Sequence, residues 1–179
     1  SDYWRLWRSL AAWVQPAFPT GVSIETVVSA SSEANAWPFR HALGRDQHLL
    51  IVTDSAIKRM QKLASLLPRA AEAEPKVWQG STTLSAVFPK ENRTSEDFEA
   101  FAQVVLQAAF VFLFNHELAH LHNGHDGCAA STSTLDWYAE LAARPARIRR
   151  TVEFDADASA FAWTLFFYSR YNADPQLLT

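Results

Sequence analysis

The sequence has few of the residues that crosslink chains or bind polyanions. Cys128 is the only cysteine among 179 residues, which excludes an internal disulfide and tolerates a reducing compartment. Sixteen basic against 19 acidic residues give a net charge of −3, without a long basic run, so nucleic acid is a poor candidate partner. The chain begins Ser-Asp-Tyr-Trp, without a signal-peptide pattern, and we expect a cytoplasmic protein.

Long hydrophobic runs are also missing. The longest uncharged apolar stretch, residues 101–114, is interrupted by Gln103 and Gln107 and is shorter than the roughly 20 residues that cross a bilayer. We therefore expect a buried core helix and no membrane span. Aromatic side chains are plentiful in the first forty residues, where they are expected to pack in the core rather than in an apolar groove. They are Trp4, Trp7, Trp13, Phe18, Trp37 and Phe39.

Composition and periodicity indicate an α+β fold in one domain, residues 1–179. In the N-terminal α/β part, residues 1–90, we expect a helix, two strands separated by a polar loop, a helix capped by Asp54 or Ser55 that ends before Pro68, and a third strand. Their expected ranges are 3–14, 21–29, 48–53, 54–67 and 77–87. Small N-terminal strands should pack on the helical C-terminal part, residues 91–179, where helices are expected over 96–122, 135–143 and 146–171.

The helix expected over 96–122 ends in an HExxH motif, His116-Glu-Leu-Ala-His120. Residues four apart lie one turn above each other on a helix, so both imidazoles can bind one ion while Glu117 reaches its water. A zinc ion lowers the pKa of bound water toward about 7, and a nearby carboxylate can take the proton. The motif predicts one Zn²⁺ per chain, bound by His116 and His120, with Glu117 as general base.

A catalytic zinc ion needs a third protein ligand, and Glu153 on the last helix is the best candidate. Asp157 lies one turn further along the same face, where it can accept a hydrogen bond from a ligating histidine and fix its orientation. Asp155 is about 200° round the helix from Glu153 and is expected to face away. Asp136 and Glu140 remain alternative ligands, although neither has a downstream Ala-Asp pair.

These motifs resemble those of the gluzincin metallopeptidases, which have HExxH on one helix and a glutamate ligand within ExxxD on a later one. The stretch from His116 to His125, followed by Glu153-Phe-Asp-Ala-Asp157, is similar to the subgroup with ExxAD and a histidine five residues after the second ligand. The resemblance covers about 60 residues and implies a minimal gluzincin fold, an active-site helix beside a glutamate helix, with a protein or peptide as substrate. The longer metzincin motif fails, because Asn123 and Asp126 replace its glycine and third histidine.

Other readings stay open beside a zinc peptidase. A module of the same fold could bind zinc for regulation or interaction without catalysis, although Glu117 argues against it, because a structural zinc site needs no base. A helical domain without metal would not respond to chelators. Phage-exclusion peptidases and phage-repressor-cleaving regulators also use HExxH domains of this size. His122 and His125 could bind a second metal, but we expect them to support the ligands or to lie at the surface. For the other candidates packing or solvent exposure is the expected outcome: Cys128, Arg147, Arg149, Arg150, Tyr168 and Tyr171.

Overall fold

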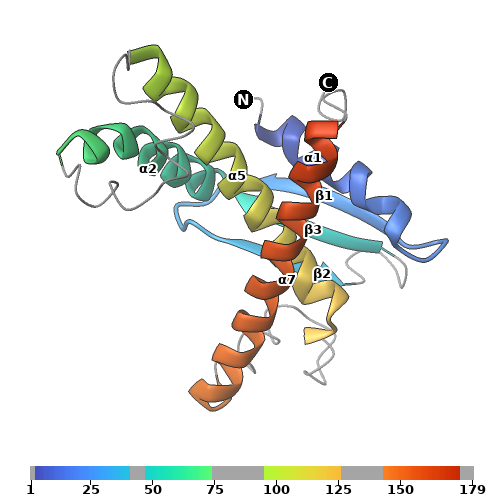
Figure 1. Ribbon diagram of the computed structural model, residues 1–179. Coiled ribbons are helices and arrows are strands. Elements are labelled where there is room, and N and C mark those ends of the chain that lie inside the picture. Colours follow the sequence, from blue (N-terminus) through green and yellow to red (C-terminus); the bar gives the residue numbers. More distant parts are fainter. Residues whose placement is uncertain (1–2, 41–46, 74–94, 126–142, 174–179) are drawn as a thin grey trace.

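The computed structural model describes residues 3–40, 47–73, 95–125 and 143–173 (Figure 1). Within these ranges the chain forms one three-stranded sheet and four α-helices, which confirms an α+β fold that is mostly helical. The strand expected within residues 77–87 lies outside the described residues, as does all of the helix expected over 135–143 except Ala143.

The sheet consists of β1 (Ser23–Ser29), β2 (Ala36–Arg40) and β3 (Gln47–Thr53), in the order β1-β3-β2. β1 pairs in parallel with β3 from Ser23↔Gln47 onward, and β2 pairs antiparallel on the other side of β3. The prediction of a polar loop between the first two strands was wrong, because β2 lies there. Its Pro38 lacks a backbone N–H and is tolerated because β2 is an edge strand.

The N-terminal helix α1 (Tyr3–Val14) packs on the buried face of the sheet and continues into a short 3₁₀ turn, η1 (Gln15–Ala17). Trp7 is 1% exposed and donates a hydrogen bond from Nε1 to the carbonyl of Leu50 in β3, at 3.2 Å. Its ring also meets Phe110 and Phe114 edge-on, with centroids 5.2 and 5.0 Å away. This tryptophan therefore connects α1, the sheet and the helix that contains Phe110 and Phe114 in one core.

Helix α2 (Asp54–Ala73) follows β3 directly. Its cap is Thr53 rather than the predicted Asp54 or Ser55, since the Thr53 hydroxyl accepts a hydrogen bond from the backbone N–H of Ala56 at 3.1 Å. The helix also continues past Pro68, where we expected its end. Proline removes its own backbone donor and its ring crowds the carbonyl four residues earlier, but the Ala-Ala-Glu-Ala segment that follows favours a helix by its high propensity.

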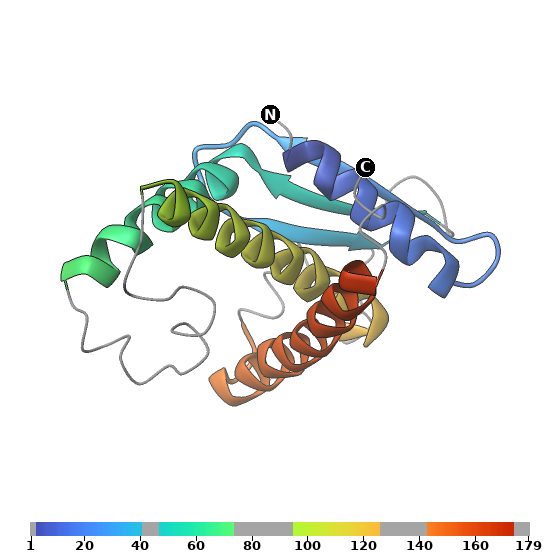
Figure 2. The same cartoon turned by 45° about the horizontal axis from the view of Figure 1, so that its top comes forward.

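The two longest helices, α5 (Ser95–His122) and α7 (Ala146–Ala173), match the predicted ranges within a few residues. Figures 1 and 2 show α7 lying across the C-terminal half of α5, on the side away from the strands. Residues 102–122 of α5 are long and apolar enough to cross a membrane, but 56% of their most apolar window is buried inside the protein. This is weak evidence for a membrane span, since the core helix of a soluble protein passes the same test.

Candidate functional site

Three predicted ligand residues meet where α5 and α7 cross. The Nε2 atoms of His116 and His120 are 3.1 Å apart. Oε2 of Glu153, which comes from α7, lies 3.3 Å from Nε2 of His116 and 3.8 Å from Nε2 of His120. The structure therefore brings together residues that are more than thirty positions apart in the sequence, with one donor atom of each facing the same point.

The three distances fit the donor set of a tetrahedral metal ion. A zinc ion bound at 2.0–2.1 Å by nitrogen or oxygen ligands separates neighbouring ligand atoms by about 3.3 Å. The observed separations of 3.1, 3.3 and 3.8 Å are close to that value. Two imidazoles and one carboxylate are also the donor types that catalytic zinc sites use.

His116 is oriented directly by a carboxylate. Its Nδ1 lies 2.9 Å from Oδ1 of Asp157, one turn beyond Glu153 on α7. A carboxylate can only accept here, so the His116 proton is on Nδ1 and the lone pair of Nε2 faces the other ligands. Asp157 thus lies where the sequence predicted it, beside His116.

His120 is oriented by a longer hydrogen-bonded chain. Its Nδ1 lies 3.0 Å from Nδ1 of His125, and Nε2 of His125 lies 2.8 Å from Oδ2 of Asp155. The same carboxylate oxygen accepts a hydrogen bond of 2.7 Å from the side-chain amide of Asn123. Because Asp155 accepts the proton on Nε2 of His125, a neutral His125 has its lone pair on Nδ1 and accepts from Nδ1 of His120. The lone pair of His120 then lies on Nε2, toward His116 and Glu153.

The turn after α5 makes this chain possible. The helix ends at His122, and the backbone N–H of Asn123 still donates to the carbonyl of Ala119 at 2.8 Å. Gly124 follows with a φ of 71°, a left-handed conformation that glycine adopts without a steric penalty. The chain reverses there, and His125 returns to a buried position beside His120.

The hydrogen bonds on both sides therefore point three acceptor atoms at one another. With the protons of His116 and His120 on their Nδ1 atoms, both Nε2 lone pairs face the carboxylate of Glu153. Three lone pairs at these distances repel one another unless a proton or a cation lies between them. The arrangement is thus suited to a cation held by the His116, His120 and Glu153 side chains.

The pKa values of the cluster reflect the same crowding. Burial opposes protonation of His116, but its contact with Glu153 and the nearby carboxylates outweigh this effect and raise its pKa. Burial, followed by the charge of His116, lowers the pKa of His120 to about 4. The hydrogen bond with His116 lowers the pKa of Glu153, although partial burial acts in the opposite direction.

Glu117 is the buried acid of the site. Its residue is 5% exposed, and burial raises the pKa of the carboxyl group to about 8. Within the part of the chain that the structure describes, its Oε2 is buried without a hydrogen-bond partner. Burying such an oxygen unpaired is unfavourable, so it is a strong candidate for contact with a ligand or water.

A family model described as Peptidase U49 matches residues 27–176 of the chain. The chain belongs to the Peptidase U49 family. This membership supports peptidase activity on a peptide substrate, and the match covers β2, β3 and the crossing of α5 with α7. No curated protein and no solved structure matches the chain.

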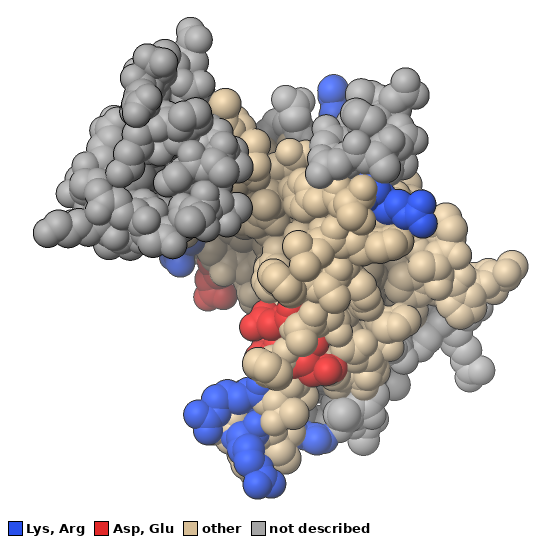
Figure 3. All heavy atoms as spheres, viewed as in Figure 1, with Lys and Arg blue, Asp and Glu red and all other residues tan. Residues whose placement is uncertain are grey.

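The site of this U49 chain opens to solvent along α7. The side chains of Glu153, Asp155 and Asp157 are 49%, 54% and 57% exposed, whereas those of His116 and His120 are 15% and 3% exposed. Figure 3 shows acidic side chains midway along α7 and a basic group at its beginning, where Arg147 and Arg150 are exposed as expected. The two imidazoles are therefore largely buried, and the carboxylates lie at the surface.

Sequence reasoning missed the contribution of Asp155 and Asn123. Asp155 was expected to face away from Glu153, yet it reaches the cluster indirectly through His125. His125 was expected either to support the candidate ligands or to lie at the surface, and the turn at Gly124 brings its ring back to a buried position beside His120.

The remaining predicted candidates lie apart from the cluster or outside the described residues. His122 is exposed and meets the ring of Trp163 edge-on, with centroids 5.3 Å apart. Tyr168 packs against the hydrophobic core. Outside the described part of the chain lie the alternative ligands Asp136 and Glu140, the thiol of Cys128 and the side chain of Tyr171.

Proposed function

We propose that this member of the Peptidase U49 family is a zinc-dependent peptidase of the gluzincin type. Its ligands are His116, His120 and Glu153, which bind one Zn²⁺ per chain. The observation that carries the proposal is the convergence of three acceptor atoms, 3.1–3.8 Å apart, two of which are imidazole nitrogens whose lone pairs are directed there by hydrogen bonds at Nδ1. A protein or peptide chain is the substrate.

The ion would supply Lewis acidity, polarising the scissile carbonyl and acidifying the attacking water. The protein supplies the proton transfers and the orientation. Glu117 takes the proton of the water on its free Oε2 and returns it to the leaving amine. Its pKa of about 8 in the metal-free protein reflects burial, and a nearby cation favours the ionised form that can accept a proton.

Asp157 and His125 act through the ligands rather than on the substrate. Asp157 holds the proton of His116 on Nδ1, and His125 does the same for His120. Each ring is thereby prevented from presenting an N–H to the ion, which needs the lone pair of a neutral imidazole. Loss of either support should weaken metal binding without removing a ligand.

The alternative is a zinc-binding module of the same fold that performs no catalysis. Such a module would need His116, His120 and Glu153 but would have no use for Glu117. An ionisable side chain that is 5% exposed and has an unpartnered oxygen is unfavourable for stability. Its presence beside the ligands supports the catalytic proposal.

The proposal is tested by measuring zinc per chain and hydrolysis of a peptide library in four proteins. We expect one equivalent of zinc in the wild type, retention of zinc in Glu117→Gln and Asp136→Ala, and its loss in Glu153→Ala. Hydrolysis should fall by about 10²–10⁴-fold in Glu117→Gln, because a general base contributes that much to the rate. Asp136→Ala should cleave like the wild type.

Each of the other outcomes identifies a different error. Loss of zinc in Asp136→Ala with retention in Glu153→Ala would make Asp136 the third ligand. Full zinc content with equal hydrolysis by wild type and Glu117→Gln would exclude the proposed role of Glu117. A protein that binds no zinc after reconstitution would rule out a zinc peptidase.

A further inference from the structure

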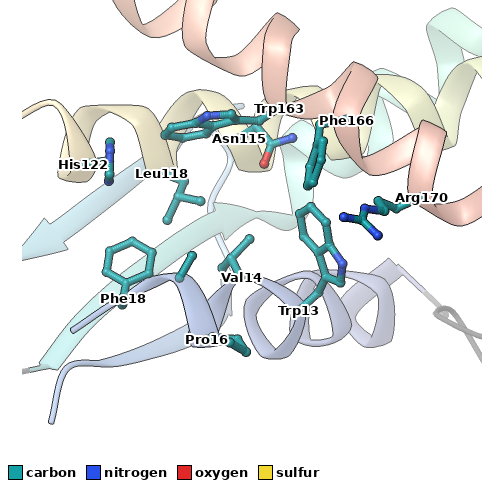
Figure 4. Close-up of a pocket in the computed structure, with 11 residues that line it drawn as sticks. Trp13, Val14, Pro16, Phe18, Asn115, Leu118, His122, Trp163, Phe166 and Arg170 are labelled. Carbon is teal, nitrogen blue, oxygen red and sulfur yellow. The ribbon is translucent and has the colours of Figure 1, made fainter. Parts of the chain in front are cut away.

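A cavity lies between α5, the α1–η1 segment and α7, on the side of α5 away from the candidate metal site. Its volume is about 760 Å³. Positions 115, 118 and 122 of α5 line it, while positions 116, 117 and 120 face the candidate metal site on a different side of the same helix. Figure 4 shows Trp13 and Phe166 facing each other at one end, with Phe18 and His122 at the other. The cavity is therefore separate from the cluster of ligands.

Five of the eleven lining residues have aromatic rings, counting His122. The Trp13 and Phe166 rings have centroids 6.2 Å apart, and the centroids of His122 and Trp163 are separated by 5.3 Å. Ligand pockets commonly have volumes of about 300–1,000 Å³ and apolar walls with a few polar groups. The size and the lining of this cavity match that description.

The polar groups of the lining favour an anion over a cation. The guanidinium of Arg170 only donates hydrogen bonds, Asn115 and His122 can donate as well as accept, and none of the described lining residues is acidic. Arg170 is exposed, and its guanidinium lies 5.4 Å from the centre of the Phe166 ring. It has no ion-pair partner within the part of the chain that the structure describes. A positive group thus stands at the rim of a partly aromatic cavity, without an ion pair among the described residues.

We propose that this cavity binds a small amphipathic carboxylate, with its apolar body between the aromatic rings and its anionic group on Arg170. Apolar surface and a single cation together favour such a molecule over a neutral or cationic one of equal size. The ligand would lie against the back of α5, where Asn115 donates a hydrogen bond of 3.1 Å to Thr164 of α7. This inference does not depend on the proposed peptidase activity.

The proposal is tested by titrating the full chain calorimetrically with three ten-carbon compounds below their micelle concentrations: decanoate, decanol and decylammonium. They have apolar chains of similar length, and their head groups are anionic, neutral and cationic, respectively. We expect decanoate to bind about tenfold more tightly than decanol, the effect of one charge-assisted hydrogen bond, and decylammonium to bind most weakly.

Two variants and a control assign the site. Arg170→Gln should reduce the preference for decanoate over decanol to less than about threefold. Arg8→Gln removes a cation that stacks on Trp4, outside the cavity, and should keep the full preference. Ala17→Trp places a large ring in the cavity from an exposed position on η1 and should abolish binding of both decanoate and decanol.

Three results would overturn the proposal. They are the absence of decanoate binding to the wild type, equal affinities for decanoate and decanol, and an undiminished preference in Arg170→Gln. Decanoate binding that survives in Ala17→Trp would place the ligand elsewhere on the chain. Circular dichroism of each variant shows whether the fold is retained, so that a lost signal is not mistaken for a lost site.

Discussion

The two histidines of the HExxH motif are supported in different ways. His116, 15% exposed, contacts the carboxylate of Asp157 directly. His120, 3% exposed, contacts the ring of His125, and only beyond that ring does a carboxylate, Asp155, appear at the surface. Burying a charge is far less favourable than burying a hydrogen-bonded neutral ring. The neutral ring of His125 therefore links buried His120 to the exposed carboxylate of Asp155, so that no charged side chain has to be buried beside His120.

The same difference separates the two pKa values. The pKa of His116 is raised, because the contact with Glu153 and the surrounding negative charge outweigh its burial. The pKa of His120 is lowered to about 4, first by burial and then by the charge of His116. In the metal-free protein a proton that relieves the repulsion among the three acceptors therefore goes to His116.

Removing the proposed zinc ion should have the largest effect on stability, because His116 and His120 then lose the partner that they are proposed to share. At a free zinc concentration roughly 100 times the dissociation constant, the free energy of unfolding should exceed that of the chelated protein by about 3 kcal/mol. Thermal or urea unfolding with and without a chelator measures the difference. Glu153→Ala serves as the control and should unfold alike in both conditions. An equal response of the wild type and this variant would place the stabilising ion elsewhere.

Removing His125, the buried hydrogen-bond partner of His120, should have the next largest effect, which is on zinc affinity. His125→Leu removes the acceptor for Nδ1 of His120 in a place that water does not readily reach, and we expect zinc affinity to fall by 10–100-fold, near the upper end. Competition with a fluorescent chelator measures the affinity. His125→Gln, whose side-chain oxygen can accept the same hydrogen bond, should recover part of it. His122→Leu changes an exposed histidine of the same segment and should match the wild type.

Removing Asp157, the exposed hydrogen-bond partner of His116, should reduce zinc affinity less. Asp157→Ala removes the acceptor for Nδ1 of His116, but the Asp157 side chain is 57% exposed and water can take its place. We therefore expect zinc affinity to fall by about tenfold, at the lower end of the usual range for such supports. If Asp157→Ala weakened binding more than His125→Leu, burial would not determine the strength of these supports. Both variants belong in the same competition assay.

The sequence predicted the residues of the site better than their connections. Residues 116, 117 and 120 follow from helical spacing, and Asp157 follows from its position one turn after Glu153. Their expected contacts appear in the structure, as do the two long helices. These expectations succeed because each depends on a local, regular geometry.

The failures have nonlocal or competing causes. β2 escaped prediction because Pro38 opposes a strand and the contacts that stabilise β2, with β3 and α5, are nonlocal. The contact of Asp155 with His125 depends on the reversal at Gly124 and on how α7 crosses α5, neither of which a helical projection contains. Trp13 and Phe18 were expected in the core, yet both line the cavity between α5, the α1–η1 segment and α7 while remaining partly packed on the core. Periodicity reports a buried face but not the gaps between packed elements.

The smallest effect on zinc affinity should come from the surface hydrogen bonds of Asn123, which lie farthest along the hydrogen-bonded chain from His120. The side-chain amide nitrogen of Asn123 has two hydrogens and donates to both Asp155, at 2.7 Å, and Ser159, at 3.0 Å. Ser159→Ala removes one acceptor at the surface but leaves the bond to Asp155, so zinc affinity should change by less than about twofold. The competition assay used for His125→Leu resolves this difference. A loss in Ser159→Ala as large as that in His125→Leu would mean that His120 is oriented by a rigid network whose members act together. A small loss of affinity in Ser159→Ala, beside a large one in His125→Leu, would mean that hydrogen bonds farther from His120 contribute less to zinc affinity.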